Sequence, residues 1–106
     1  MNIYEMPGFP INDEVISVLE QNESVRIERI VSAGQQSDWY DQEESEFVIL
    51  LEGRAQLAFE GNRTITMEKG DTLLIPPHQK HRVANTSADP PCIWLCVFYQ
   101  VSKEGA

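Results

Sequence analysis

The chain of 106 residues has little basic character: 8 Lys and Arg stand against 17 Asp and Glu, and the net charge at neutral pH is −9. Binding to nucleic acid or to an anionic membrane surface needs basic patches, and the sequence contains none. No apolar run approaches the ~20 residues of a membrane-spanning helix. No basic segment followed by an apolar run marks the first residues as a secretory signal. We therefore expect an acidic cytoplasmic protein, with neither nucleic acid nor membrane among its partners.

Short motifs of several catalytic and nucleotide-binding folds are also missing. The phosphate loops Gly-x4-Gly-Lys-Ser/Thr and Gly-x-Gly-x2-Gly are absent, and so is the nucleophile elbow Gly-x-Ser-x-Gly. The two cysteines, Cys92 and Cys96, stand in one apolar run. On a strand they would share a face ~13 Å apart, which is too far for a disulfide. We expect two small buried side chains in a reducing compartment.

The hydrophobic pattern divides this single domain into three parts. Residues 1–24 form an N-terminal extension with one short helix, because Asn12 can cap a helix and Ile11, Val15, Val18 and Leu19 recur at helical spacing. Residues 25–101 hold short strand-like segments separated by turns, which is typical of an all-β sandwich or barrel. The expected strands are 25–30, 47–51, 55–59, 64–67, 72–75, 81–85 and 92–101. Residues 102–106 form a loose tail.

Glu46 is the most informative polar residue of the expected sheet. It precedes an apolar run, and by strand alternation it shares a face with Val48 and Leu50, which should point inward. A carboxylate on an inward face must be paired, hydrogen-bonded or bound to a metal. The alternative is a solvated position at the end of the strand, like that of the neighbouring acidic residues.

Four other polar residues are candidates for the same site. His78 and His81 follow a pair of prolines, and two imidazoles with one carboxylate resemble a metal-binding facial triad; the alternative is that one or both are ordinary loop residues. Tyr40 and Gln42 share a face if they lie on a strand. Both are poor metal ligands, but both can hydrogen-bond a small molecule or order a water beside Glu46.

Two spaced frames connect these residues. The first runs Gly34-x5-Tyr40-x-Gln42-x3-Glu46-x6-Gly53, and the second runs Gly70-x5-Pro76-x4-His81-x3-Asn85. Together they resemble the two motifs of the cupin superfamily, Gly-x5-His-x-His-x3,4-Glu-x6-Gly and Gly-x5-Pro-x-Gly-x2-His-x3-Asn. The spacing is kept throughout residues 25–101. Tyr40 and Gln42 stand at the two histidine positions of the first motif, and His78 stands at the glycine of the second.

This resemblance implies a jelly-roll β-barrel of two antiparallel sheets, dimeric in many members, with a pocket at the barrel mouth. Typical members hold one divalent metal through three His and one Glu. Carried over to this chain, only Glu46 and His81 remain as ligands, and Gln42 or His78 would have to complete the shell. A weakly held divalent metal (Fe, Mn, Ni or Zn) is therefore the cofactor that the resemblance implies.

The leading hypothesis is a barrel that binds a small polar molecule in a pocket lined by Tyr40, Gln42, Glu46, His78 and His81. One alternative is a metal-dependent enzyme (an oxygenase, isomerase or lyase) in which Glu46 and His81 are the ligands. Another is a barrel without a ligand, in which these two side chains form a structural pair.

Self-association is expected as well. We expect the aromatic residues Tyr4, Phe9 and Trp39 to be exposed, and they accompany an apolar N-terminal segment. Exposed aromatic side chains of this kind suit an interface between copies. We therefore expect a homodimer.

Overall fold

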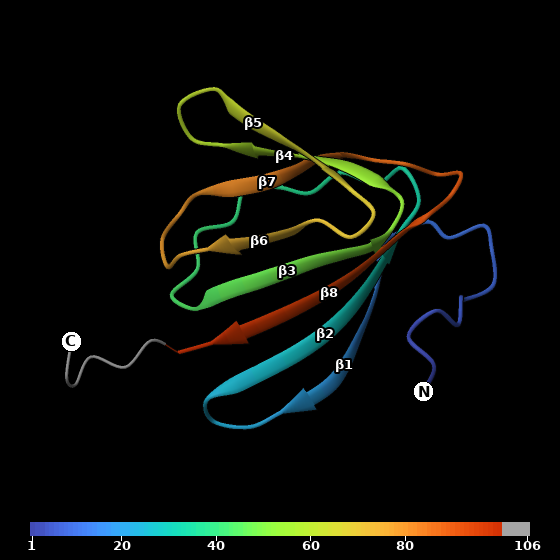
Figure 1. Cartoon of the computed structure of the whole chain (residues 1–106), viewed down its shortest axis with the longest axis horizontal. Coiled ribbons are helices and arrows are strands. Elements are labelled where there is room, and N and C mark those ends of the chain that lie inside the picture. Colours follow the sequence, from blue (N-terminus) through green and yellow to red (C-terminus); the bar gives the residue numbers. More distant parts are fainter. Residues whose placement is uncertain (101–106) are drawn as a thin grey trace.

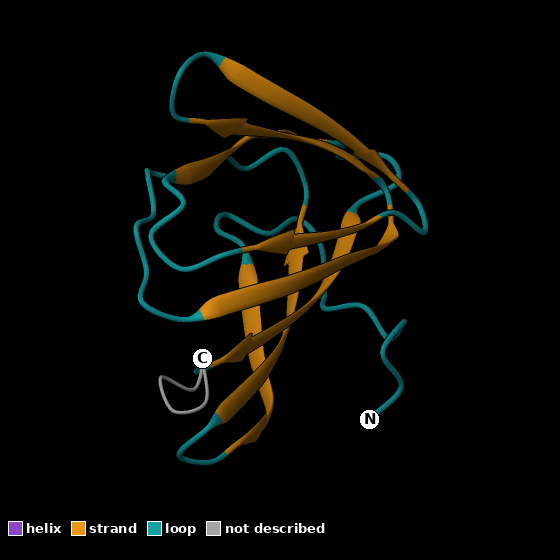
Figure 2. Cartoon of the chain, turned by 60° about the vertical axis from the view of Figure 1, so that its left-hand side comes forward, coloured by secondary structure: helices purple, strands orange, loops and turns teal. Residues whose placement is uncertain are grey.

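The protein consists of two antiparallel β-sheets that face each other, as described by a computed structural model for residues 1–100 (Figure 1). No helix occurs in this part of the chain, and strands joined by loops make up the whole of it (Figure 2). The strands are β1 (Val15–Gln21), β2 (Val25–Ser32), β3 (Ser45–Glu52), β4 (Arg54–Phe59), β5 (Arg63–Glu68), β6 (Thr72–Ile75), β7 (His81–Thr86) and β8 (Cys92–Tyr99).

The order of the strands is that of a jelly roll, with neighbours that are distant in sequence. The larger sheet has the order β1-β2-β8-β3-β6, and the smaller sheet has the order β5-β4-β7. The prediction of an all-β fold with two antiparallel sheets is thus confirmed. Within residues 1–100 the strand pairings form two separate sheets. They do not show the predicted closure into a continuous barrel.

The prediction of a short N-terminal helix is wrong. Val15–Gln21 is strand β1, which pairs with β2 from Val15 opposite Val31 to Gln21 opposite Arg26. A helix of about ten residues is marginal in water, whereas this segment is rich in β-branched residues and completes the hydrogen bonds along the edge of β2. Pairing with β2 therefore outweighed the weak helical pattern.

The predicted strands and the predicted state of the cysteines agree with the structure. All seven strands expected after residue 24 are present, with ends that differ by one or two residues. Cys92 and Cys96 lie on β8 as free, buried thiols, as expected. The expected tail, residues 102–106, lies outside the described residues. No helix in residues 1–100 is long and apolar enough to cross a membrane.

The space between the sheets is tightly filled at one end, which we call the packed end. Leu50, Ala55, Met67 and Cys92 are between 0 and 1% exposed there. The turn between β3 and β4 closes this end at Gly53, whose φ is +92°. A Cβ atom at Gly53 would lie 2.8 Å from Cα of Cys92, so only glycine fits at this position.

Candidate functional site

Glu46 lies on the inner face of the larger sheet because of its register. It stands opposite Phe98 of β8 and Ile75 of β6, and Phe98 in turn stands opposite Arg26 of β2. Directly opposed residues of antiparallel strands point to the same side of the sheet. Arg26, Phe98, Glu46 and Ile75 therefore form one row across four strands. Glu46 is only 8% exposed, in agreement with the predicted inward face.

His81 reaches the same space from the smaller sheet. It begins β7, stands opposite Phe59 of β4, and is 4% exposed. The backbone N–H of Tyr40 donates to the carbonyl of His81 over 2.7 Å, and the N–H of His81 donates to the carbonyl of Tyr40 over 3.0 Å. This pair of bonds fixes the loop before β3 beside β7. The rings of Tyr40 and His81 consequently lie 5.7 Å apart between centroids.

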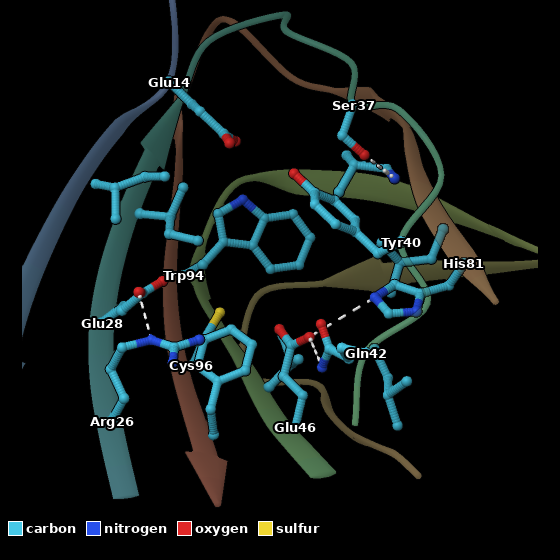
Figure 3. Close-up of a pocket in the computed structure, with 17 residues that line it drawn as sticks. Glu14, Arg26, Glu28, Ser37, Tyr40, Gln42, Glu46, His81, Trp94 and Cys96 are labelled. Carbon is cyan, nitrogen blue, oxygen red and sulfur yellow. Dashed lines mark hydrogen bonds and ion pairs between the residues drawn. The ribbon is translucent and has the colours of Figure 1, made fainter. Parts of the chain in front are cut away.

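Glu46 is contacted by two other predicted site residues. His81 Nε2 lies 3.6 Å from Glu46 Oε1, and the Gln42 amide donates to the same oxygen over 3.1 Å (Figure 3). The side chains of His81 and Glu46 are 5% and 11% exposed. A carboxylate and an imidazole that are this well buried interact through little intervening water, so their attraction is strong.

The surroundings of His81 favour its protonated form. Its Nδ1 lies 2.7 Å from the carbonyl of Gln79, so Nδ1 carries a proton and donates it there. A neutral ring would therefore turn an unprotonated Nε2 toward the Glu46 carboxylate. Burial lowers the pKa of His81, but the hydrogen bonds to Glu46 and Gln79 and the charge of Glu46 together raise it above the usual 6.5.

These side chains border a cavity of about 300 Å³ between the sheets. Most of its wall is apolar, and it includes Ile30, Val48, Leu57, Ile75, Val83 and Trp94. Tyr40, Gln42, Glu46 and His81 all line it, so the structure brings together four of the five predicted residues (Figure 3). A cavity with an apolar wall and a few convergent polar groups is the usual form of a small-molecule site.

His78, the fifth predicted residue, is not among the residues that line the cavity. Its side chain is 64% exposed, and its Nδ1 lies 2.8 Å from Oδ1 of Asp41. The backbone is left-handed at this position, with a φ of +62°, as suits the place of a motif glycine. The backbone N–H of His78 donates to the carbonyl of Gln42 over 2.8 Å. His78 therefore braces the loop that carries Gln42.

Several lining residues were not anticipated from the sequence: Glu14, Arg26, Glu28, Ser37, Trp94 and Cys96. The alternation of apolar and charged residues in β2 does not tell which set faces the core. Arg26 and Glu28 share the inner face with Ile30, through pairing with Phe98, Cys96 and Trp94. Strand alternation puts Arg26, Glu28 and Ile30 on one face, but the register with β8 that makes this face the inner one cannot be read from the sequence.

Cys96 is unsuited to act as a nucleophile in this cavity. Burial first, and then the charge of Glu46, raises the pKa of the Cys96 thiol well above its usual value. A thiol in such surroundings stays protonated near neutral pH. Cys96 thus serves as part of the cavity wall.

The donor set does not fit a tightly held divalent metal. No group of three or more His, Cys, Asp or Glu side chains within residues 1–100 is placed to hold an ion. Glu46 and His81 supply two donors. The nearest further group, the Gln42 amide, donates to Glu46, and an amide oxygen is a weak ligand for zinc, iron or nickel.

Comparison with known proteins agrees with the fold and the two sequence frames. The family model described as Cupin domain matches residues 26–98. The chain therefore belongs to the cupin superfamily. A comparison with curated proteins found no significant match.

Three solved structures illustrate the range of similarity. One from Ralstonia eutropha JMP134, provisionally described as a mannose-6-phosphate isomerase, is 34% identical, with 95% of this chain and 97% of that chain covered and a TM-score of 0.89. A cupin superfamily protein from Desulfitobacterium hafniense DCB-2 is 18% identical, with 90% and 84% covered and a TM-score of 0.78. A cupin family protein from Methanocaldococcus jannaschii is 21% identical, with 92% of both chains covered and a TM-score of 0.73. The last two similarities concern the fold alone.

Proposed function

We propose that the protein binds a small polar molecule in the cavity between the sheets. The observation that carries this proposal is the convergence of Tyr40, Gln42, Glu46 and His81, from three separate segments, on a cavity with an apolar wall. Polar side chains at the inner side of a β-sandwich weaken its packing unless they are satisfied. A ligand with polar groups on an apolar frame would bond to the positions that these side chains leave free, such as the second oxygen of Glu46, and would also cover the wall.

Each polar side chain would have a definite role toward such a ligand. His81 donates from Nε2 when its ring is protonated, the Glu46 carboxylate accepts, and the Tyr40 hydroxyl can do either. Gln42 holds one oxygen of Glu46 and leaves the other oxygen for the ligand. This set suits hydroxyl, amino or carbonyl groups that lie next to one another on a compact molecule.

A second candidate is an enzyme acting at the same site. The 34% identical structure is provisionally described as a mannose-6-phosphate isomerase. Glu46 and His81 form an acid–base pair at 3.6 Å inside the cavity, and such a pair could move a proton between neighbouring atoms of a substrate. Interconversion of mannose 6-phosphate and fructose 6-phosphate by the purified protein, measured with a coupled assay, tests this candidate. A rate equal to that of the His81→Gln variant would count against it.

The metal-dependent form of this candidate has its own measurement. Protein purified without added metal would be analysed for Fe, Mn, Ni and Zn. A full equivalent of one metal that resists a mild chelator would support it. Because the donor set is incomplete, we expect substoichiometric metal that a chelator removes without changing the melting temperature.

The ligand-binding proposal is tested by a thermal-shift panel of sugars, keto acids and amino-acid-like compounds. A ligand that binds only the folded protein raises its melting temperature. Gln42→Ala should weaken this effect. Gln56→Ala is the matched control, because Gln56 is hydrogen-bonded to Asn85 and does not line the cavity. No response to any compound, or equal responses in both variants, would oppose the proposal.

We further propose that the protein forms a homodimer. Tyr4, Phe9 and Trp39 are 53%, 47% and 46% exposed. Burial of such side chains between two copies would remove apolar area from water. Size-exclusion chromatography with light scattering measures the mass directly, and a mass of one chain at micromolar concentration would contradict a stable dimer.

A further inference from the structure

The cavity has more acidic than basic groups along its wall. Three carboxylates line it, those of Glu14, Glu28 and Glu46. Arg26 is the one guanidinium or ammonium group among the lining residues within the described part of the chain, and His81 is the one imidazole. Arg26 and His81 can bind an anionic ligand only to the extent that carboxylates of the protein do not already occupy them.

Both basic side chains already have carboxylate partners. Arg26 Nε lies 2.8 Å from Glu28, and its two terminal nitrogens lie 3.0 and 3.3 Å from Glu44. The guanidinium also lies over the ring of Phe98, 4.3 Å from the centroid. His81 faces Glu46. An anionic ligand would therefore have to compete with carboxylates of the protein for each positive charge.

Glu14 is the carboxylate that remains without compensation. Its side chain is half-buried, and it has no ion-pair partner within residues 1–100. Figure 3 shows it directed from the start of β1 into the space above Trp94, across from the Tyr40 hydroxyl. Burial first, and then the charges of Glu28 and Asp13, raises the pKa of Glu14. A carboxylate held in such a place is stabilised by an arriving positive charge.

The aromatic side chains around this space favour the same kind of group. Trp94 and Tyr40 both border the cavity. The faces of aromatic rings carry negative potential and attract organic cations, and Trp is the strongest of them. Carboxylates together with aromatic faces are what an ammonium group needs in order to leave water.

We infer that the ligand carries an organic ammonium group, which binds between Glu14 and the aromatic faces of Trp94 and Tyr40 while its apolar part lies on the cavity wall. This inference rests on the proposed function and narrows it to one chemical class. Anionic ligands, including sugar phosphates, are disfavoured by the same charges, and the net charge of −9 adds to that effect.

The test compares compounds that match in shape and differ in charge. Isothermal titration calorimetry would be carried out with cyclohexylammonium, cyclohexanol and cyclohexanecarboxylate, and then with glucosamine, glucose and glucose 6-phosphate. We expect the ammonium compound of at least one set to bind about tenfold more tightly than its neutral analogue, which corresponds to about 1.4 kcal/mol. The anion of that set should bind most weakly, and added salt should reduce the preference.

Two variants connect the preference to Glu14. Glu14→Gln should abolish the tenfold advantage of the ammonium compound over its neutral analogue. Glu20→Gln is the matched control, because Glu20 is an exposed residue of β1, the strand that directly follows Glu14, and does not line the cavity. An equal loss in both variants would overturn the role of Glu14.

The outcomes separate this inference from the proposal on which it rests. Equal affinities within each set, or tightest binding of the anion, overturn the charge preference while small-molecule binding stands. Absence of binding by all six compounds also overturns it, even where a different compound of the thermal-shift panel binds. A failure of every compound in both experiments removes the proposed function as well.

Discussion

The same strands build both ends of the space between the sheets. One is the packed end, and the other, which holds the cavity, is called the open end. β3 runs from Glu46 at the open end to Leu50 at the packed end, and β8 runs from Cys92 at the packed end to Phe98 at the open end. At the packed end the inner side chains are apolar and nearly inaccessible. At the open end a carboxylate and an imidazole occupy inner positions of the same kind, which shows that the difference is in side chains rather than in backbone.

We expect the packed end to supply most of the stability and the open end to supply the proposed binding. Apolar burial stabilises by about 25 cal/mol per Å², so the packed end contributes most where contact is closest. Buried charges contribute little net stability, because desolvation offsets their attraction. We therefore expect the polar side chains that occupy interior positions at the open end to bind the ligand.

The largest effect is expected from Gly53→Ala at the packed end. The new methyl group would lie 2.8 Å from Cα of Cys92 and 2.9 Å from the carbonyl of Pro91, at a φ of +92°. Backbone cannot move aside as a flexible side chain can, and the left-handed conformation adds about 1–2 kcal/mol. We expect a loss of about 4 kcal/mol in the free energy of unfolding, measured by urea denaturation.

Gly34→Ala is the control for this substitution. Its φ is +95°, but no atom lies within 4 Å of the position that the methyl group would take. It should therefore lose only the conformational part, about 1–2 kcal/mol. Equal losses in the two variants would show that contact with Cys92 does not matter and would remove the special role of the packed end.

The next effect is expected from His81→Ala at the open end. This change leaves the buried Glu46 without its cation, and breaking a buried pair by removing one partner costs about 3 kcal/mol. Gln42 still donates to Glu46 and moderates the loss. Urea denaturation at pH 6 measures it. A loss below about 0.5 kcal/mol would mean that the two side chains are hydrated and independent.

The same pair predicts how stability changes with pH. Because the pKa of His81 is raised in the folded state, the stabilisation is fully present below pH 6.5 and is lost as the pH rises through the higher folded value. The difference in unfolding free energy between the native protein and His81→Gln should therefore shrink as the pH rises above 6.5. A difference that grows over this range would show that the folded protein holds His81 neutral.

The smallest effect on stability is expected from Tyr40→Phe. Tyr40 is 44% exposed, and removal of its hydroxyl should change the free energy of unfolding by less than about 0.5 kcal/mol. The affinity for whichever panel compound binds should nevertheless fall, because the hydroxyl borders the cavity. Calorimetry on this variant and on the native protein gives both values. A large loss of stability with unchanged affinity would contradict this account, because Tyr40 would then stabilise the fold and would not bind the ligand.

The sequence was informative where a single local pattern decides the outcome. Strand alternation placed Glu46 inward, and the two motif frames brought Tyr40, Gln42 and His81 to one site. It failed for β1, because the pairing partner that turns this segment into a strand lies elsewhere in the chain. It also missed Arg26 and Glu28, since the face that a charged residue occupies depends on what covers the sheet. Homodimer formation, cytoplasmic location and the ligand remain predictions.

The most direct test of the division between the ends is a double replacement, Glu46→Leu with His81→Leu. Replacing a buried ion pair by apolar residues of similar size is often neutral or stabilising by about 1–4 kcal/mol. We predict that this variant unfolds with at least the native free energy and no longer binds the compounds that the native protein binds. A loss of several kcal/mol would make the pair structural, and native affinity in a stable variant would place the ligand elsewhere.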